Sequence, residues 1–141
     1  MPTRVAQIGT GNVGTHALRS LITNPDFELT GVWVSSEAKA GKDAAELVGF
    51  DSPTGVIATN DLDAVLATKP DCAVYTAMAD NRLMEALEDY RRILAAGVNV
   101  VGSGPVFLQW PWQVIPDEMV KPIEEAAREG NSSVYINGID P

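Results

Sequence analysis

The chain has 141 residues, a length that fits one compact domain with its own hydrophobic core. Its formal net charge of -9 would repel nucleic-acid phosphates and anionic membrane surfaces, so we expect neither as a partner. The single cysteine excludes an intramolecular disulfide and a cysteine-cluster metal site, and no segment approaches the ~20 apolar residues of a membrane span, so a cytoplasmic protein is expected.

Six apolar runs have the length of buried strands, with helical patterns between them. They predict strands at residues 4–8, 29–34, 55–59, 72–76, 98–102 and 133–137. Cys72, in the fourth run, is predicted to be a buried packing residue.

Five helices are predicted between these strands. The first spans residues 12–23 and ends before Asn24-Pro25, and its apolar face comprises Val13, Ala17, Leu18, Leu21 and Ile22. Shorter helices are expected at residues 43–48 and 61–68.

The fourth helix has the clearest pattern. Asp80 is its predicted N-cap, Gly97 follows its end, and its apolar stripe comprises Leu83, Met84, Leu87, Tyr90 and Leu94. The charged residues of this helix are predicted to form a solvated face that mixes both signs, Glu85, Glu88 and Asp89 with Arg82, Arg91 and Arg92. A fifth helix is expected at residues 117–129, with its regular part starting either there or at Pro122.

Strands that alternate with helices at this spacing predict an α/β fold with a doubly wound parallel sheet, here a Rossmann-type dinucleotide-binding domain over residues 1–141. An irregular stretch, residues 102–116, carries two glycines, three prolines and two tryptophans.

Three glycines lie between the first strand and the first helix, with the spacing Gly9-x-Gly11-x-x-Gly14. In this context Gly9 permits a tight turn, Gly11 admits a diphosphate to the backbone, and Gly14 allows close helix packing. Main-chain N–H groups at the helix start would bind the diphosphate, so the predicted cofactor-binding residues here are Gly9, Thr10, Gly11, Asn12, Val13 and Gly14. A tight turn that binds no ligand is the alternative.

The end of the second strand bears on which cofactor is used. Ser35 and Ser36 follow the apolar run, with Lys39 and Lys42 further on, and hydroxyls with lysines suit a 2′-phosphate. Glu37 would instead bind a ribose 2′-hydroxyl if the strand ended later. We therefore predict NADP over NAD, with Ser35, Ser36 and Lys39 as cofactor contacts.

Ligands of open α/β sheets bind beyond the carboxyl ends of the strands. Small residues at two further strand ends leave room for a flat cofactor, which adds Thr76, Ala77, Met78, Ser103 and Gly104 to the predicted contacts.

Several motifs together resemble those of the N-terminal domain of dihydrodipicolinate reductase-like proteins: GTGNVG at 9–14, AGKDAAELVG at 40–49, DLDAVLATKPD at 61–71, GVNVVGSGP at 97–105 and a terminal NGIDP. The chain is most similar to the branch with 2,4-diaminopentanoate dehydrogenase and the native amine dehydrogenases, whose actinobacterial members carry a stretch like PVFLQWPW. The resemblance implies an NAD(P)H-dependent oxidoreductase that acts on C=N or CH–NH bonds of an amine or imine substrate.

The resemblance also implies a second, substrate-binding domain and a homo-oligomer, so the 141 residues are expected to be a fragment that binds cofactor without turnover. No catalytic residue is predicted. The substrate-binding HHxxK stretch of dihydrodipicolinate reductase has no counterpart, because the only histidine, His16, is predicted to lie on a helix surface. Some amine-forming relatives place a glutamate after the fifth strand, where this chain has only Gln109 and Gln113, and an amide cannot exchange a proton at neutral pH.

Other features leave alternatives open. Trp110 and Trp112 are expected at an interface or pocket wall, with ordinary packing as the alternative. Asp140 belongs to a GIDP turn that the family keeps near the cofactor's reactive end. A non-catalytic nucleotide-binding or sensing module is the competing function, and a domain that binds coenzyme A or S-adenosylmethionine is a third possibility.

Overall fold

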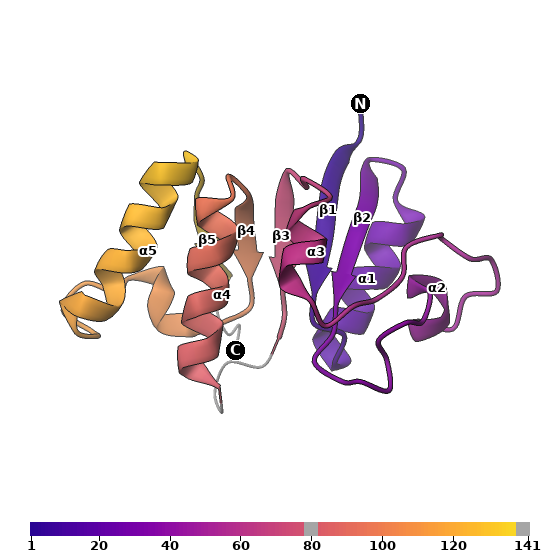
Figure 1. Cartoon of the computed structure of the whole chain (residues 1–141), viewed down its shortest axis with the longest axis horizontal. Coiled ribbons are helices and arrows are strands. Elements are labelled where there is room, and N and C mark those ends of the chain that lie inside the picture. The colour runs from indigo at the N-terminus through magenta and orange to yellow at the C-terminus, as the bar shows by residue number, and fades with distance from the viewer. Residues whose placement is uncertain (78–81, 138–141) are drawn as a thin grey trace. The chain divides into compact units, whose positions relative to one another are not determined.

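The computed structural model describes residues 1–77 and 82–137, and the chain divides into two compact units, residues 1–77 and 78–141 (Figure 1). Each unit has parallel strands joined through helices.

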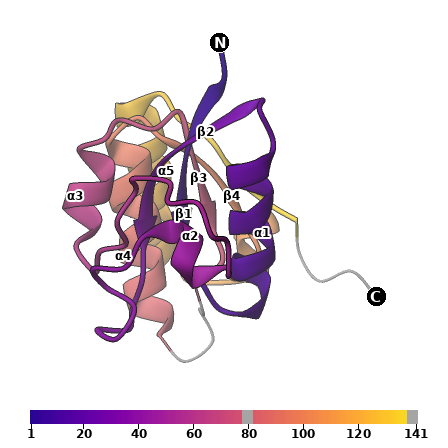
Figure 2. The ribbon, with the colours of Figure 1, turned by 90° about the vertical axis from the view of Figure 1, so that its right-hand side faces the viewer.

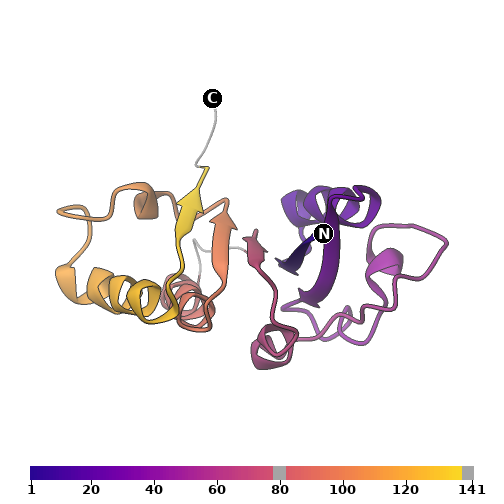
Figure 3. The same ribbon diagram turned by 90° about the horizontal axis from the view of Figure 1, so that it is seen from above.

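The first unit is a parallel sheet with β1 at its centre, paired with β2 on one side and β3 on the other. Figures 2 and 3 show α1 and α3 on opposite faces of this sheet. The elements are β1 (Thr3–Ile8), α1 (Asn12–Thr23), β2 (Phe27–Trp33), α2 (Ala44–Leu47), α3 (Leu62–Leu66) and β3 (Cys72–Tyr75).

The core of the first unit lies where α1 packs on β2 and α2. Its buried members are Leu18, Val32, Val34, Ala44, Val48 and Ala58. The apolar periodicity of α1 places Leu18 and Leu21 inside, as predicted, but Val13 is 60% exposed. Val13 lies in the first turn of α1, at the end of the helix beside the glycine loop. The prediction that Val13 belongs to the core face is therefore wrong.

Residues 55–59 do not form the predicted strand. Their main chain bonds mainly to the loop at 41–44, through Ala58 N–H to Lys42 O and Ala44 N–H to Val56 O, each 2.8 Å long. Only Thr59 reaches the sheet, by an isolated bridge to Trp33. The apolar run instead forms a loop segment whose main chain pairs with another loop, while Ala58 packs in the core.

The second unit pairs β4 with β5 in parallel, and α4 and α5 lie on one side of this pair (Figure 3). Val100 on β4 and Ile136 on β5 are buried, whereas Val101 and Tyr135, which pair with each other in the register, are exposed. The elements are α4 (Leu83–Ala95), β4 (Asn99–Gly102), the 3-10 helix η1 (Val106–Gln109), α5 (Asp117–Gly130) and β5 (Val134–Ile136).

Helix α4 departs from its prediction at two residues, Met84 and Asp89. It begins at Leu83 after Arg82, whereas the predicted N-cap, Asp80, lies outside the described residues. Met84 is 64% exposed, because it lies on the same side of the helix as exposed Glu88. Asp89 is only 8% exposed and pairs with Arg82, with 3.4 Å between Oδ2 and Nη2, so it does not belong to a solvated face.

Helix α5 is continuous from Asp117 and includes Pro122 in its second turn. The alternative start at Pro122 is therefore wrong. The buried residues Val120, Ile123 and Ala126 follow helical spacing across the proline, so packing maintains the helix through it.

These observations confirm the predicted fold class, an α/β fold of doubly wound, Rossmann type with parallel strands joined through helices. Cys72 is only partly buried, because it is the first residue of β3, so its prediction as a buried packing residue is wrong. In the described ranges, no helix has the length and apolar character needed to cross a bilayer.

Candidate functional site

A turn at Gly9 joins β1 to α1. Gly9 has a φ of +100°, in the left-handed region that residues with a Cβ rarely adopt. A Cβ there would also lie 2.6 Å from the main-chain nitrogen of Ala77, which follows β3. The predicted tight turn is confirmed, and it brings the loop against the carboxyl end of the neighbouring strand.

Gly14 is buried in α1 and faces the same turn. A Cβ on Gly14 would lie 2.5 Å from Thr76 Oγ1 and closer still to the carbonyl oxygen of Gly9. Any side chain would push α1 away from the ends of β1 and β3. The close approach predicted for Gly14 is therefore present.

Gly11 differs from the other two glycines because its surroundings are open. Its φ of -75° is accessible to every residue, and an added Cβ would meet no atom of the described residues within 4 Å. As the residue before α1 it has no side chain to cap the helix, and the first turn holds no acidic residue. The first N–H groups of α1 therefore face an open space without a competing side-chain acceptor, which favours an anion there.

Lys39 approaches the glycine loop from the loop after β2. Its Nζ donates to the Thr10 carbonyl at 3.0 Å and to Thr10 Oγ1 at 3.3 Å. Thr10 is itself buried. The structure thus brings together two predicted contacts that lie 29 residues apart, and places a positive charge beside the glycine loop.

The remaining residues after β2 are mostly exposed. Strand β2 ends at Trp33, before the serines, so the condition for Glu37 to serve as a ribose acceptor is not met. Ser36 forms a local turn in which its Oγ accepts from the Ala38 N–H at 3.2 Å, while Ser35 is exposed. Lys42 is exposed as well.

Gln7, which sequence reasoning missed, lies under the glycine loop. It is fully buried on β1, and its Nε2 donates to the Gly9 carbonyl and to Thr76 Oγ1, both at 2.9 Å. Its Oε1 has no hydrogen-bond partner among the described residues. A single amide in the otherwise apolar interior of β1 was the signal that could have identified this residue.

The other predicted contacts divide between the units. Thr76 and Ala77 touch the glycine loop in the first unit. Ser103 and Gly104 follow β4 in the second unit, where the Tyr90 hydroxyl donates to the Gly104 carbonyl at 2.7 Å. Met78 lies outside the described residues, as does Asp140.

The His16 and Gln109 side chains make no hydrogen bond to the glycine loop among the described residues. His16 is exposed on α1, as predicted. Gln109 Nε2 donates to the Ile136 carbonyl at 3.1 Å and so fastens η1 to β5.

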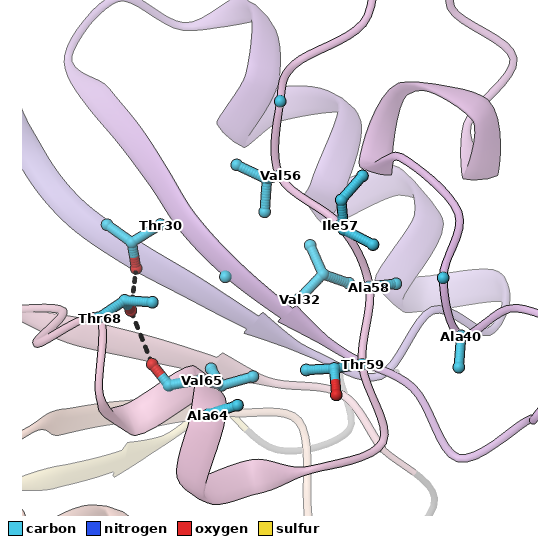
Figure 4. A pocket seen from close by; sticks show the side chains of 13 residues that line it. Thr30, Val32, Ala40, Val56, Ile57, Ala58, Thr59, Ala64, Val65 and Thr68 are labelled. Carbon is cyan, nitrogen blue, oxygen red and sulfur yellow. Dashed lines mark hydrogen bonds between the residues drawn. The ribbon is translucent and has the colours of Figure 1, made fainter.

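A separate hollow of about 580 Å³ lies in the first unit beside β2 and α3 (Figure 4). Its only polar side chains are threonines, and Thr68 Oγ1 bonds to the Val65 carbonyl at 2.6 Å and to Thr30 Oγ1 at 3.0 Å. It contains no titratable group and none of the glycine-loop residues. The hollow therefore lacks the chemistry of an acid–base site.

Comparison with known proteins agrees with this geometry. The family model described as dihydrodipicolinate reductase, N-terminus, matches residues 3–101, which include the glycine loop and Lys39. The chain belongs to this family.

One relative of this chain is an amine dehydrogenase of Streptomyces virginiae, which is 41% identical over 133 residues. The matched residues make up 94% of this chain and 37% of the relative. Among solved structures, an amine dehydrogenase from Mycobacterium smegmatis matches with a TM-score of 0.83 at 24% identity, over 95% of this chain and 38% of its own. A biliverdin reductase from Synechocystis sp. PCC 6803, solved with biliverdin and NADP+, matches with a TM-score of 0.68 at 22% identity. This match covers 96% of the present chain and 38% of the reductase. The structural matches extend the fold assignment to nearly the whole chain, which spans well under half the length of each relative.

Proposed function

We propose that this chain is the nicotinamide-dinucleotide-binding part of an oxidoreductase that acts on C=N or CH–NH bonds, with an amine or imine as substrate. Its family and the amine dehydrogenase named among its relatives support this reaction class. The relatives are much longer, so we assign the substrate pocket, the proton transfer and the contacts of a homo-oligomer mainly to a further domain of the intact protein.

The observation that carries the proposal is the open N-terminus of α1 behind Gly11. Gly9 and Gly14 are required by the turn itself, whereas nothing in the described protein requires glycine at position 11. A bare backbone at an open helix start is what a diphosphate needs for close approach.

The residues present fit a nicotinamide dinucleotide. Main-chain N–H groups at Gly11, Asn12 and Val13 would hold its diphosphate, and Thr76, Ala77, Met78, Ser103 and Gly104 are further proposed contacts. When bound, the cofactor supplies the hydride chemistry, and the protein supplies binding, orientation and exclusion of water.

Within this function we propose a preference for NADP over NAD. Lys39 brings an ammonium group to the glycine loop, and Ser35 and Ser36 follow β2, where a 2′-phosphate would be bound. No carboxylate lies between the end of β2 and Glu37, and Glu37 is exposed. A carboxylate at the end of β2 would instead favour the ribose 2′-hydroxyl of NAD.

The variant Gly11→Val tests the proposed function. The valine has room in the free protein, so the fold should persist, but its side chain would occupy the approach to the helix start. Calorimetric titration with NADPH should show binding to the wild type and at least about tenfold weaker binding to the variant, a loss of about 1.4 kcal/mol. Ser20→Val, exposed on the same helix, is the matched control and should bind normally. Equal affinity in Gly11→Val and the wild type would refute the proposal.

The variants Lys39→Met and Lys42→Met test the cofactor preference. Loss of the Lys39 charge should weaken NADPH binding about tenfold and NADH binding much less, because only NADPH carries the 2′-phosphate. Lys42→Met, which removes an exposed charge from the same loop, should change neither affinity. A wild-type protein that binds NADH more tightly than NADPH would contradict the preference and leave dinucleotide binding intact.

A further inference from the structure

We propose that Gln7 is a positioning residue that sets the orientation of the Gly9–Thr10 peptide, and with it the diphosphate affinity of the glycine loop. This inference rests on the proposed dinucleotide-binding function.

Burial of the Gln7 side chain carries an energetic cost. The side chain is fully buried, and its Oε1 lacks a partner among the described residues. An unsatisfied buried acceptor costs about 1–3 kcal/mol. A methionine or leucine would fill the site without that cost, so the contribution of the amide lies in its two N–H donors.

The side-chain N–H donors of Gln7 bind two oxygens beside the glycine loop. The Nε2 group lies 2.9 Å from the Gly9 carbonyl oxygen and 2.9 Å from Thr76 Oγ1. The reverse amide orientation would set Oε1 against the Gly9 oxygen, two acceptors in contact, so the chemistry requires the donor there. Gln7 therefore links the turn after β1 to the end of β3.

The hydrogen bond to the Gly9 carbonyl also orients the Gly9–Thr10 peptide. Glycine at position 9 has access to several peptide orientations, because it lacks a Cβ. In a planar trans peptide the C=O and the next N–H point in opposite directions. With the Gly9 carbonyl held against Gln7, the Thr10 N–H must point away from Gln7. The amide thus selects one orientation of the backbone donors at the start of the loop.

The variant Gln7→Met separates positioning from stability. Thr76 Oγ1 lies 3.2 Å from the Gly9 carbonyl and can donate to it in place of the amide, so the variant should fold with little change in melting temperature. NADPH affinity should nevertheless fall about tenfold, because the Thr76 hydroxyl, which also lies 3.3 Å from the Ile8 carbonyl oxygen, would then be the remaining donor to the Gly9 carbonyl and would fix the peptide orientation less firmly. The amide resonance of Thr10 should also shift in the ligand-free variant.

Val5→Ala is the matched control, a buried change on the same strand that should lower the melting temperature and leave the affinity unchanged. Reduced stability in Gln7→Met with unaltered NADPH affinity would show a merely structural role and overturn the inference. A wild type that binds no dinucleotide would instead overturn the proposed function.

A second measurement needs no variant. When the wild type is titrated with NADPH, the side-chain amide resonances of Gln7 should move with the main-chain amide of Thr10 along one saturation curve. The side-chain amide of Gln113, on the 102–116 stretch, should not follow that curve. If the Gln7 resonances stay fixed while Thr10 moves, the inference is wrong.

Discussion

Asp43 fastens the loop at 54–55 to the start of α2. Its Oδ1 accepts from the N–H and hydroxyl of Thr54 and from the N–H of Ala45, and its Oδ2 accepts from the N–H of Gly55. The Thr54 N–H, followed by the Ala45 N–H, lowers the pKa of Asp43 from 3.8 to about 2. All of these bonds favour the ionised form.

This lowered pKa predicts a pH-dependent contribution to stability. Because the folded-state pKa is below the unfolded value, the contribution is complete above about pH 3.8 and is lost as the pH falls toward 2. Asp43→Asn should lower the melting temperature at neutral pH, and its difference from wild type should shrink over that window. Asp51→Asn, an exposed change in the same loop, is the control, and an unchanged Asp43→Asn difference between neutral pH and pH 2 would contradict the prediction.

Residues of the candidate site differ in whether local sequence determines their contacts. The turn at Gly9 and the close packing at Gly14 follow from local spacing, so sequence alone indicated them. Lys39 was predicted from its residue type, but its contact with Thr10 depends on how the loop after β2 folds back. Gln7 was missed because its partners, Gly9 and Thr76, lie on two different strand ends.

At the scale of elements, α5 contains a proline that destabilises the helix locally, and packing of the apolar face offsets this destabilisation. Pro122 cannot donate to the Glu118 carbonyl, and a proline inside a helix costs about 3 kcal/mol. Pro122→Ala should therefore raise the stability of the chain by about 2 kcal/mol, less than the full cost because proline also restricts the unfolded chain. Denaturant unfolding measures this, with exposed Lys121→Ala as control. A variant no more stable than wild type would show that the first turns of α5 already tolerate the proline.

Element prediction succeeded where one local pattern sufficed. Helix α1 has the predicted bounds, and five of the six strand predictions overlap observed strands. The failure at 55–59 has a tertiary cause, since the main chain of the apolar run bonds mainly to the loop at 41–44 and only Thr59 bonds to β2. Helix α4 begins at Leu83, and its predicted N-cap, Asp80, lies outside the described residues.

At the scale of the whole molecule, the second unit exposes two apolar pairs, Val101 with Tyr135 and Trp110 with Trp112, which together are called its apolar surface here. Val101 and Tyr135 are neighbours on the sheet face opposite Val100 and Ile136, and Trp110 stacks edge-on against Trp112 with 5.0 Å between ring centroids. Tyr135 and Trp110 are 66% and 68% exposed. Parallel sheets are normally covered on both faces, so this surface favours a partner.

We expect a second copy of the 141-residue chain to cover this surface in solution. The net charge of -9 on each copy opposes association, so added salt should strengthen it by screening that repulsion. Sedimentation at several concentrations should therefore show a dimer that increases with both protein and salt. The double variant Trp110→Ser/Tyr135→Thr should raise the dissociation constant at least about tenfold. Met84→Gln, which removes another exposed apolar side chain from α4, should leave it unchanged. A monomer at every concentration, or equal effects of the two variants, would show that this surface does not bind a second copy.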